Sequence, residues 1–300
     1  MQTKKSSRKI TSRAKNEFIW GWLFVLPTVI GLMVLNIIPI FNTISQSFFK
    51  TGDFGKGNIF IGFANYQKLL SDPLVLKAIV NTVQYAVIEV PFSIFIALVL
   101  ASMLSGKRKG RSIYRTIFFL PMVAAPAAIA MVWRWLYNTD FGLINNIFHV
   151  KINWISNPNI SIFSIAVIGI WSVIGYNIVL FIAGLQEIPQ DYYEAARIDG
   201  ASPIHQFFQI TIPLLSPTLF FVAVTRIIGA LQVFDFIYMI MDRTNPALND
   251  TQSLVYLFYK YSFRERNLGY GATIVMILLV LIIIVTIFQL WAQKKWVHYY

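Results

Sequence analysis

The stretch DYYEAARIDGASPIHQFFQITIPLLSP, residues 191–217, decides how this chain folds. It has mixed polarity and favours helix, yet it stands between two strongly apolar segments. An ordered element in such a place must contact something outside a lipid bilayer. It is therefore the first clue to function.

The residues of this stretch predict a helix, a tight turn and a second helix. Asp191 followed by Glu194 is a form of the capping box. Gly200 can adopt the left-handed conformation that ends a helix. Ser202 and Pro203 then suit the cap and the first turn of a second helix. Two later prolines are expected to interrupt it before the next apolar segment: Pro213 and Pro217.

Composition identifies a polytopic membrane protein. Of the 300 residues, 57% are hydrophobic and only 13% are charged, whereas soluble domains carry about 25% charged residues. The chain has no cysteine, which excludes disulfides, thiol nucleophiles and cysteine metal sites. Its three histidines form no ligand pattern, so no metal site is expected. The net charge of +12 is distributed as topology signals rather than as a nucleic-acid surface.

About 20 apolar residues cross a bilayer, and six segments of this chain qualify. The predicted fold is an all-α bundle of six transmembrane helices over residues 18–293, with basic tails at 1–17 and 294–300. Prolines inside the spans are tolerated where neighbouring helices satisfy the freed backbone groups. The approximate limits of the spans are Phe18–Ile40, Ala78–Leu104, Ile113–Leu136, Ile160–Gln186, Thr218–Met241 and Ala272–Trp291.

Basic clusters predict the orientation, because short cytoplasmic loops carry an excess of Lys and Arg. Such clusters occur in the N-terminal tail, at residues 107–111 and at Lys294–Lys295. With six spans they share one side, the cytoplasm. The loop at 190–217 is then also cytoplasmic, although Arg197 is its one Lys or Arg. The external loops are expected to have little order, apart from Asn58–Leu76.

Glu89, Arg226 and Asp235 fall within predicted spans, and Arg134 lies near the end of one. A charge at the bilayer centre costs roughly 2.5–3.5 kcal/mol, so such residues usually face a cavity or a partner. Arg226 and Asp235 point to nearly opposite faces of one helix and cannot pair directly. Asp235 can snorkel to the interface, Arg226 can pair with another subunit, and Glu89 can hydrogen-bond within the bundle.

Polar and aromatic side chains inside the spans are candidates for a substrate pathway. Tyr176 and Asn177 lie in the fourth span, and Gln232 and Asp235 lie in the fifth. Amide groups and aromatic faces suit a sugar, through hydrogen bonds to hydroxyls and stacking on C–H surfaces. The alternative is polar contact between helices, which is common in membrane bundles.

Enzyme motifs are absent from the sequence. No G-x-x-x-x-G-K-[ST] phosphate loop occurs, so an ATPase that energises this protein would be a separate chain. An ion-coupled secondary transporter remains an alternative, although it would need a better buried carboxylate pair than Glu89 and Asp235. A membrane scaffold or sensor is a further alternative.

Residues 194–201, EAARIDGA, resemble the cytoplasmic signature of bacterial importer permeases of the ATP-binding-cassette class. The segment IPLLSP at 212–217 completes that signature, and the lead-in AGLQEIP at 183–189 matches the carbohydrate-uptake branch. The likeness extends over nearly the whole chain. Its further matches are IGFANY at 61–66, YR at 114–115, FLP at 119–121 and QVFD at 232–235.

The resemblance implies the fold of a type I importer permease and a mechanism. Two permease subunits would form the pathway, each placing this loop in a cleft on one of two cytoplasmic ATPase subunits. The motif glutamate, Glu194, would pair with a basic residue of the ATPase, and Gly200 would permit the turn. The other residues of the coupling surface would be Ala195, Ala196, Arg197 and Asp199.

The same resemblance implies that this chain is not an enzyme and holds no cofactor of its own. ATP and Mg would be bound by the ATPase subunits. An extracytoplasmic solute-binding lipoprotein would deliver a carbohydrate, such as an oligosaccharide, to a multi-pass protein of the bacterial inner membrane. Both termini would be cytoplasmic. One departure is DRTNPALND at 242–250, where relatives carry a Gly-Gly-Pro run. It puts details of binding-protein docking in doubt.

Overall fold

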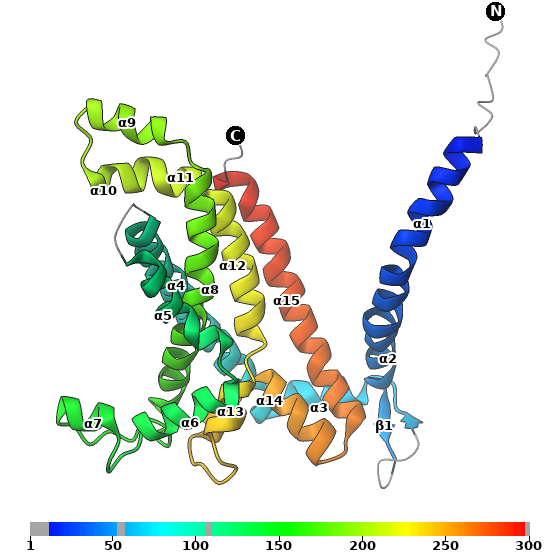
Figure 1. Ribbon diagram of the computed structural model, residues 1–300. Helices are drawn as coiled ribbons and strands as arrows, with labels where there is room; N and C mark the ends of the chain where they lie inside the picture. The colour runs from blue at the N-terminus through cyan, green and yellow to red at the C-terminus, as the bar shows by residue number, and fades with distance from the viewer. Residues whose placement is uncertain (1–11, 53–57, 106–109, 298–300) are drawn as a thin grey trace, which may run out of the picture.

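The computed structural model describes residues 12–52, 58–105 and 110–297, and most of them are helical (Figure 1). Most of the basic N-terminal tail and the basic residues 107–109 lie outside this part of the chain. Five helical stretches in the described part are long and apolar enough to span a membrane. They are Lys15–Gln46, Pro73–Ser105, Ser161–Glu187, Ser216–Ile240 and Leu268–Trp296.

These stretches contain the main helices of the bundle. The first runs through α1 (Ser12–Leu32), a π-helical turn (Met33–Ile37) and α2 (Ile38–Gln46). The fourth joins α12 (Ser216–Leu231) to α13 (Asp235–Ile240). The other three stretches are single helices: α4 (Pro73–Ser105), α8 (Ser161–Glu187) and α15 (Leu268–Trp296).

The third predicted span is not one continuous helix. It is divided into α5 (Arg111–Val123) and α6 (Pro126–Leu136), which meet at an angle of 100°. The two residues between them, Ala124 and Ala125, are extended. The ring of Pro126 disfavours helical geometry at the preceding residue, and Pro126 itself suits the first turn of a helix. The expectation that a proline would be accommodated here was therefore wrong at Pro126.

The core of the bundle is the contact between α4 and α8, which run side by side. Gly169 allows the close approach, because a Cβ added there would lie 2.0 Å from the hydroxyl oxygen of Tyr85. Gly175 does the same for α5, since its added Cβ would lie 2.1 Å from the carbonyl oxygen of Phe118. Fully buried Ile165, Ile168 and related side chains fill the space between these helices.

A small β-hairpin and a short helix close one end of the molecule. Strand β1 (Phe49–Thr51) pairs antiparallel with β2 (Asn58–Phe60), and α3 (Ala64–Ser71) follows. The amide of Asn65 donates to the carbonyl oxygens of Ser47 and Phe49, at 2.9 and 3.0 Å. The hydroxyl of Tyr66 lies 2.7 Å from that of Ser47. Two residues of the IGFANY motif therefore hold α3 against the start of the hairpin.

Asp72 ties α3 and α4 to the start of α15. Its carboxylate accepts from the hydroxyl of Tyr270 at 2.7 Å and from that of Tyr261 at 3.5 Å. Burial, and after it the Asp72 carboxylate, raises the pKa of Tyr261 to about 12. The Tyr261 phenol therefore remains a hydrogen-bond donor at neutral pH.

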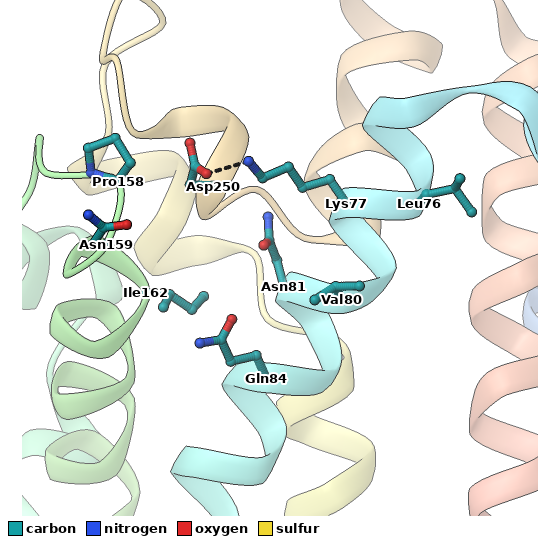
Figure 2. Close-up of a pocket in the computed structure, with 9 residues that line it drawn as sticks. All are labelled: Leu76, Lys77, Val80, Asn81, Gln84, Pro158, Asn159, Ile162 and Asp250. Atoms are coloured by element: carbon teal, nitrogen blue, oxygen red, sulfur yellow. Dashed lines mark ion pairs between the residues drawn. The ribbon is translucent and has the colours of Figure 1, made fainter.

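The hairpin end has more order than the sequence indicated. Lys77 on α4 forms an ion pair with Asp250, and Asn81 donates to the carbonyl oxygens of Asn249 and Gln252, both at 3.1 Å (Figure 2). Arg134 pairs with Asp242 at 3.1 Å. The expectation of little order was wrong. The helical pieces there are α7 (Leu143–Phe148), a 3-10 turn (Leu248–Asp250), α14 (Leu254–Tyr259) and a π-helical turn (Lys260–Arg264).

Helix α1 stands apart from the bundle in Figure 1 and meets it through α2 and the hairpin. None of its apolar membrane-length window is buried within the described chain. Phe24 in α1 and Leu35 in the π-helical turn that follows it are about three-quarters exposed, at 76% and 74%. Within the described chain, this apolar surface of α1 is left uncovered.

Candidate functional site

The loop predicted to couple the protein to a partner is an ordered helical unit at the end opposite the hairpin (Figure 1). It contains α9 (Gln190–Ile198), α10 (Pro203–Gln206), a π-helical turn (Phe207–Thr211) and α11 (Ile212–Leu214). The second helical piece therefore continues further than the two prolines predicted. Pro213 and Pro217 each occupy the first positions of a new helix, where a missing N–H is tolerated.

Helix α9 begins two residues earlier than the capping pattern indicated. Pro189 is its N-cap, and no side chain caps this end. Asp191 instead lies within the first turn, where its charge is favourable to the positive end of the helix. The prediction of a capping box at Asp191 was therefore wrong, because the extended Pro189 already marks the start of the helix.

Gly200 makes the turn between the two helices. Its φ is +76°, in the left-handed region that favours glycine. The amide of Ala201 donates to the carbonyl oxygen of Ala196 at 2.9 Å, as in the Schellman arrangement that closes a helix end. Ser202 then caps α10 by accepting from the amide of His205 at 3.2 Å. The left-handed turn at Gly200 and the cap at Ser202 were both predicted from the sequence, and both are confirmed.

Two contacts hold α9 and the second helical piece together as one body. The hydroxyls of Tyr193 and Thr211 lie 3.0 Å apart. The side chain of Gln206 donates to the carbonyl oxygen of Ala201 at 2.8 Å. A hollow of about 620 Å³ lies beneath, between this body and the ends of α4 and α8. These contacts join α9 and the turn to the rest of the unit.

The outer surface of this unit is almost entirely exposed. Glu194, Ala195, Arg197, Asp199 and Gly200 are all exposed, and Ala196 is half-buried. Two apolar side chains beside them are strongly exposed: Ile198 at 86% and Ile204 at 73%. An exposed apolar pair flanked by charges is typical of a surface that binds another protein. The sequence did not single out either isoleucine, although an apolar side chain in a polar loop is a usable signal.

A second cluster lies inside the membrane-spanning part, around one buried ion pair. Arg226 on α12 donates to Glu89 on α4 at 2.8 Å. The Glu89 side chain is fully buried and that of Arg226 is 16% exposed. Sequence analysis identified both residues but not their pairing, because 137 positions separate them. In the described chain, Glu89 Oε2 and Arg226 Nε have no hydrogen-bond partner.

Arg226 lines a small polar cavity of about 160 Å³ between α4, α8 and the α12–α13 junction. Gln232 and Asp235, two of the predicted pathway residues, line the same cavity. Helix α8 contributes Gly169, Ser172 and Val173. We call this space the polar cavity. The sequence did not single out Ser172, although its polar side chain in an apolar span was a usable signal.

The other two predicted pathway residues do not line the polar cavity. Tyr176 is half-buried and lies one turn beyond Ser172 on α8. Asn177 is fully buried, and both of its amide atoms lack a partner in the described chain. Helical geometry directs Asn177 about 100° away from Tyr176, to a different side of α8.

Known proteins resemble this chain in sequence and in architecture. The model of the family described as "Binding-protein-dependent transport system inner membrane component" matches residues 90–298. A lactose transport system permease protein from Rhizobium radiobacter is 32% identical, over 92% of this chain and 94% of its own length. An sn-glycerol-3-phosphate transport system permease protein from Rhizobium meliloti is 35% identical, over 94% of this chain and 97% of its own length.

A solved structure of a bacterial alginate ABC transporter, in complex with a periplasmic protein bound to alginate pentasaccharide, contains a chain of the same fold. Its TM-score is 0.83 at 19% identity, covering 96% of this chain and 98% of that chain. The architecture is thus that of an ABC importer permease. The family match and the full-length relatives together show that this chain belongs to the family of binding-protein-dependent transport system inner membrane components.

Proposed function

We propose that this protein is a permease subunit of an ATP-binding-cassette importer that moves a carbohydrate into the cytoplasm. The observation that carries the proposal is the exposed body formed by α9, the Gly200 turn and α10, in a chain of this family. The end of the bundle that carries α9 and α10 would face the cytoplasm, and so would both termini. The basic residues of the last turn of α15, Lys294 and Lys295, support this orientation.

Two copies of a separate ATPase subunit would hold the ATP and Mg and drive the movement. The α9 unit suits such a partner, because its outer surface is almost entirely exposed. Glu194 offers a charge to a basic residue, and Ile198 and Ile204 offer apolar contacts at 86% and 73% exposure. The contact between Tyr193 and Thr211 would pass the motion to α12.

A second permease subunit would complete the pathway and cover α1. Lipid alone can surround an apolar helix, since lipid tails are as apolar as leucine. However, α1 is connected to the bundle only at its α2 and hairpin end in Figure 1. The side of α1 that faces the bundle is therefore separated from the other helices of the chain. A neighbouring subunit would use that side, and lipid would cover the rest.

A carbohydrate cargo, delivered by a solute-binding lipoprotein outside the cell, is supported by the relatives and by the polar cavity. The relatives include permeases named for lactose and for sn-glycerol-3-phosphate. Gln232, Ser172 and Arg226 offer hydrogen-bonding groups to hydroxyls. The ion-coupled alternative has no support in the family match. Its main candidate carboxylate, Glu89, is already paired with Arg226.

The coupling role is tested by Glu194→Lys and Gly200→Pro in the native host. We expect both variants to reach the membrane but to lose ATP-dependent uptake and co-purification with the ATPase. The matched control is Asp140→Lys, the same charge change at an exposed residue of the hairpin end. It should retain uptake. Normal transport by both Glu194→Lys and Gly200→Pro would refute the coupling role.

A further inference from the structure

One face of α8 connects the polar cavity to a second hollow nearer the α9 end. Gly169 and Ser172 line the polar cavity, and Val179 and Gln186 line the second hollow. Tyr176 lies between these two pairs, and Ala183 lies between Val179 and Gln186. The intervals along the series 169, 172, 176, 179, 183 and 186 alternate between three and four residues, which places all six positions on one helix face.

The second hollow has a volume of about 750 Å³ and lies between α5 and α8. We call it the α5–α8 groove. Helix α5 contributes one face of its own, spaced at i, i+3, i+4 and i+7. Four of the six lining residues are polar. The lining residues are Ser112, Arg115, Thr116, Phe119, Val179 and Gln186.

The polar edge of α5 is unsuited to lipid. Its neighbouring face is apolar and exposed, with Ile113 at 66% and Ile117 at 58%. That face is the one a bilayer would solvate. Arg115 and Thr116 are exposed on the groove side, and no ion pair to Arg115 occurs in the described chain. Polar groups at membrane depth generally line a water-filled space or contact another protein.

We infer that the α5–α8 groove is the cytoplasmic half of the substrate path, continuous with the polar cavity through the Tyr176 side of α8. The path from Ser172 to Gln186 is then about 21 Å long at 1.5 Å per residue. Tyr176 is half-buried at the junction of the two halves. Gln186, Thr116 and Arg115 provide amide, hydroxyl and guanidinium groups that hydrogen-bond a polyhydroxylated substrate as it leaves. This inference rests on the proposed function.

Single cysteines test the inference directly, because the chain contains no cysteine of its own. Thr116→Cys and Ala183→Cys lie on the groove faces of α5 and α8. Ile117→Cys and Val167→Cys are controls on the exposed apolar faces of the same two helices. The complex is kept intact in inside-out vesicles from the native host and treated with a membrane-impermeant methanethiosulfonate reagent.

We expect Thr116→Cys and Ala183→Cys to react at least an order of magnitude faster than the two controls. Their reaction should also slow several-fold when the ATPase is trapped with ATP and vanadate. Equal rates at all four positions would overturn the inference. So would protection of the groove positions in every state, since that outcome means the partner permease covers the groove. Labelling needs no uptake, so the result is separate from the Glu194→Lys test of the proposed function.

Discussion

At the scale of single residues, the spans are held together by a few close contacts that leave little tolerance for change. Gly169 lies so near Tyr85 that one methyl group would clash with the phenol. Glu89 and Arg226 neutralise each other at 2.8 Å inside the bundle. Arg226 also forms part of the wall of the polar cavity. The same residue thus forms the buried ion pair and part of the wall of the cavity that we propose meets a substrate.

The buried pair makes a prediction about stability. Removing one partner of a buried ion pair costs about 3–5 kcal/mol, because the other charge remains uncompensated. We therefore expect Glu89→Leu and Arg226→Leu each to lower the thermal midpoint of the purified complex, and the double variant to recover most of the loss. Thermal unfolding followed by size-exclusion chromatography measures this.

The control for that experiment is Arg134→Leu, which removes an exposed pair with Asp242. Its two side chains are 46% and 68% exposed. Exposed pairs contribute only about 0–1 kcal/mol, so the midpoint should change little. A Glu89→Leu variant as stable as the wild type would show that the buried pair has no structural role.

At the scale of elements, the α9 unit depends on the geometry of one residue. The turn requires φ of +76° at Gly200, and an added Cβ would meet nothing within 4 Å. Any effect of substitution there is therefore a backbone effect and not a clash. The left-handed region costs most residues roughly 1–2 kcal/mol, while asparagine adopts it more readily. Gly200 therefore differs from Gly169 and Gly175, where an added Cβ would clash with a neighbouring helix.

We expect Gly200→Ala to reduce ATP-dependent uptake and Gly200→Asn to reduce it less, with both variants present in the membrane at wild-type level. The physical reason is that alanine shifts the turn and tilts Glu194 away from its partner surface. Gly21→Ala is the matched control, since it also has nothing within 4 Å but no positive φ. Uptake by Gly200→Ala equal to that of Gly21→Ala would contradict this account.

The elements that sequence predicts well are those defined by local chemistry. Hydropathy located the long spans, and the Gly200 and Ser202 signals located the turn, because both depend on residues close together in the chain. The Glu89–Arg226 pair depends on how α4 meets α12, which no local pattern contains. The 100° break before Pro126 and the start of α9 after Pro189 each depend on a proline placed at the start of a helix. Another proline of the chain, Pro91, lies inside helix α4 without ending it, so the residue type alone does not predict a break.

At the scale of the whole molecule, the described chain leaves large surfaces uncovered. The α9 unit extends beyond the bundle at one end, and α1 stands beside the bundle without covering it (Figure 1). The loop at 242–250 is fixed to α4 and α6 by ion pairs at the opposite end. These surfaces lie at the two ends and along one side. That distribution fits partners in the cytoplasm, outside the cell and in the membrane.

Helix α1, which stands apart from the bundle, gives the last prediction. A single cysteine at Phe24 or Leu35, both about three-quarters exposed, can carry a benzophenone maleimide. If a second permease covers α1, illumination of the native complex should join the 34.3 kDa chain to a partner of similar size. The same variant expressed without its partner gene should give only lipid adducts. Lipid adducts alone in the complete complex would mean that α1 faces the bilayer on all sides, and that its separation from the bundle has another cause.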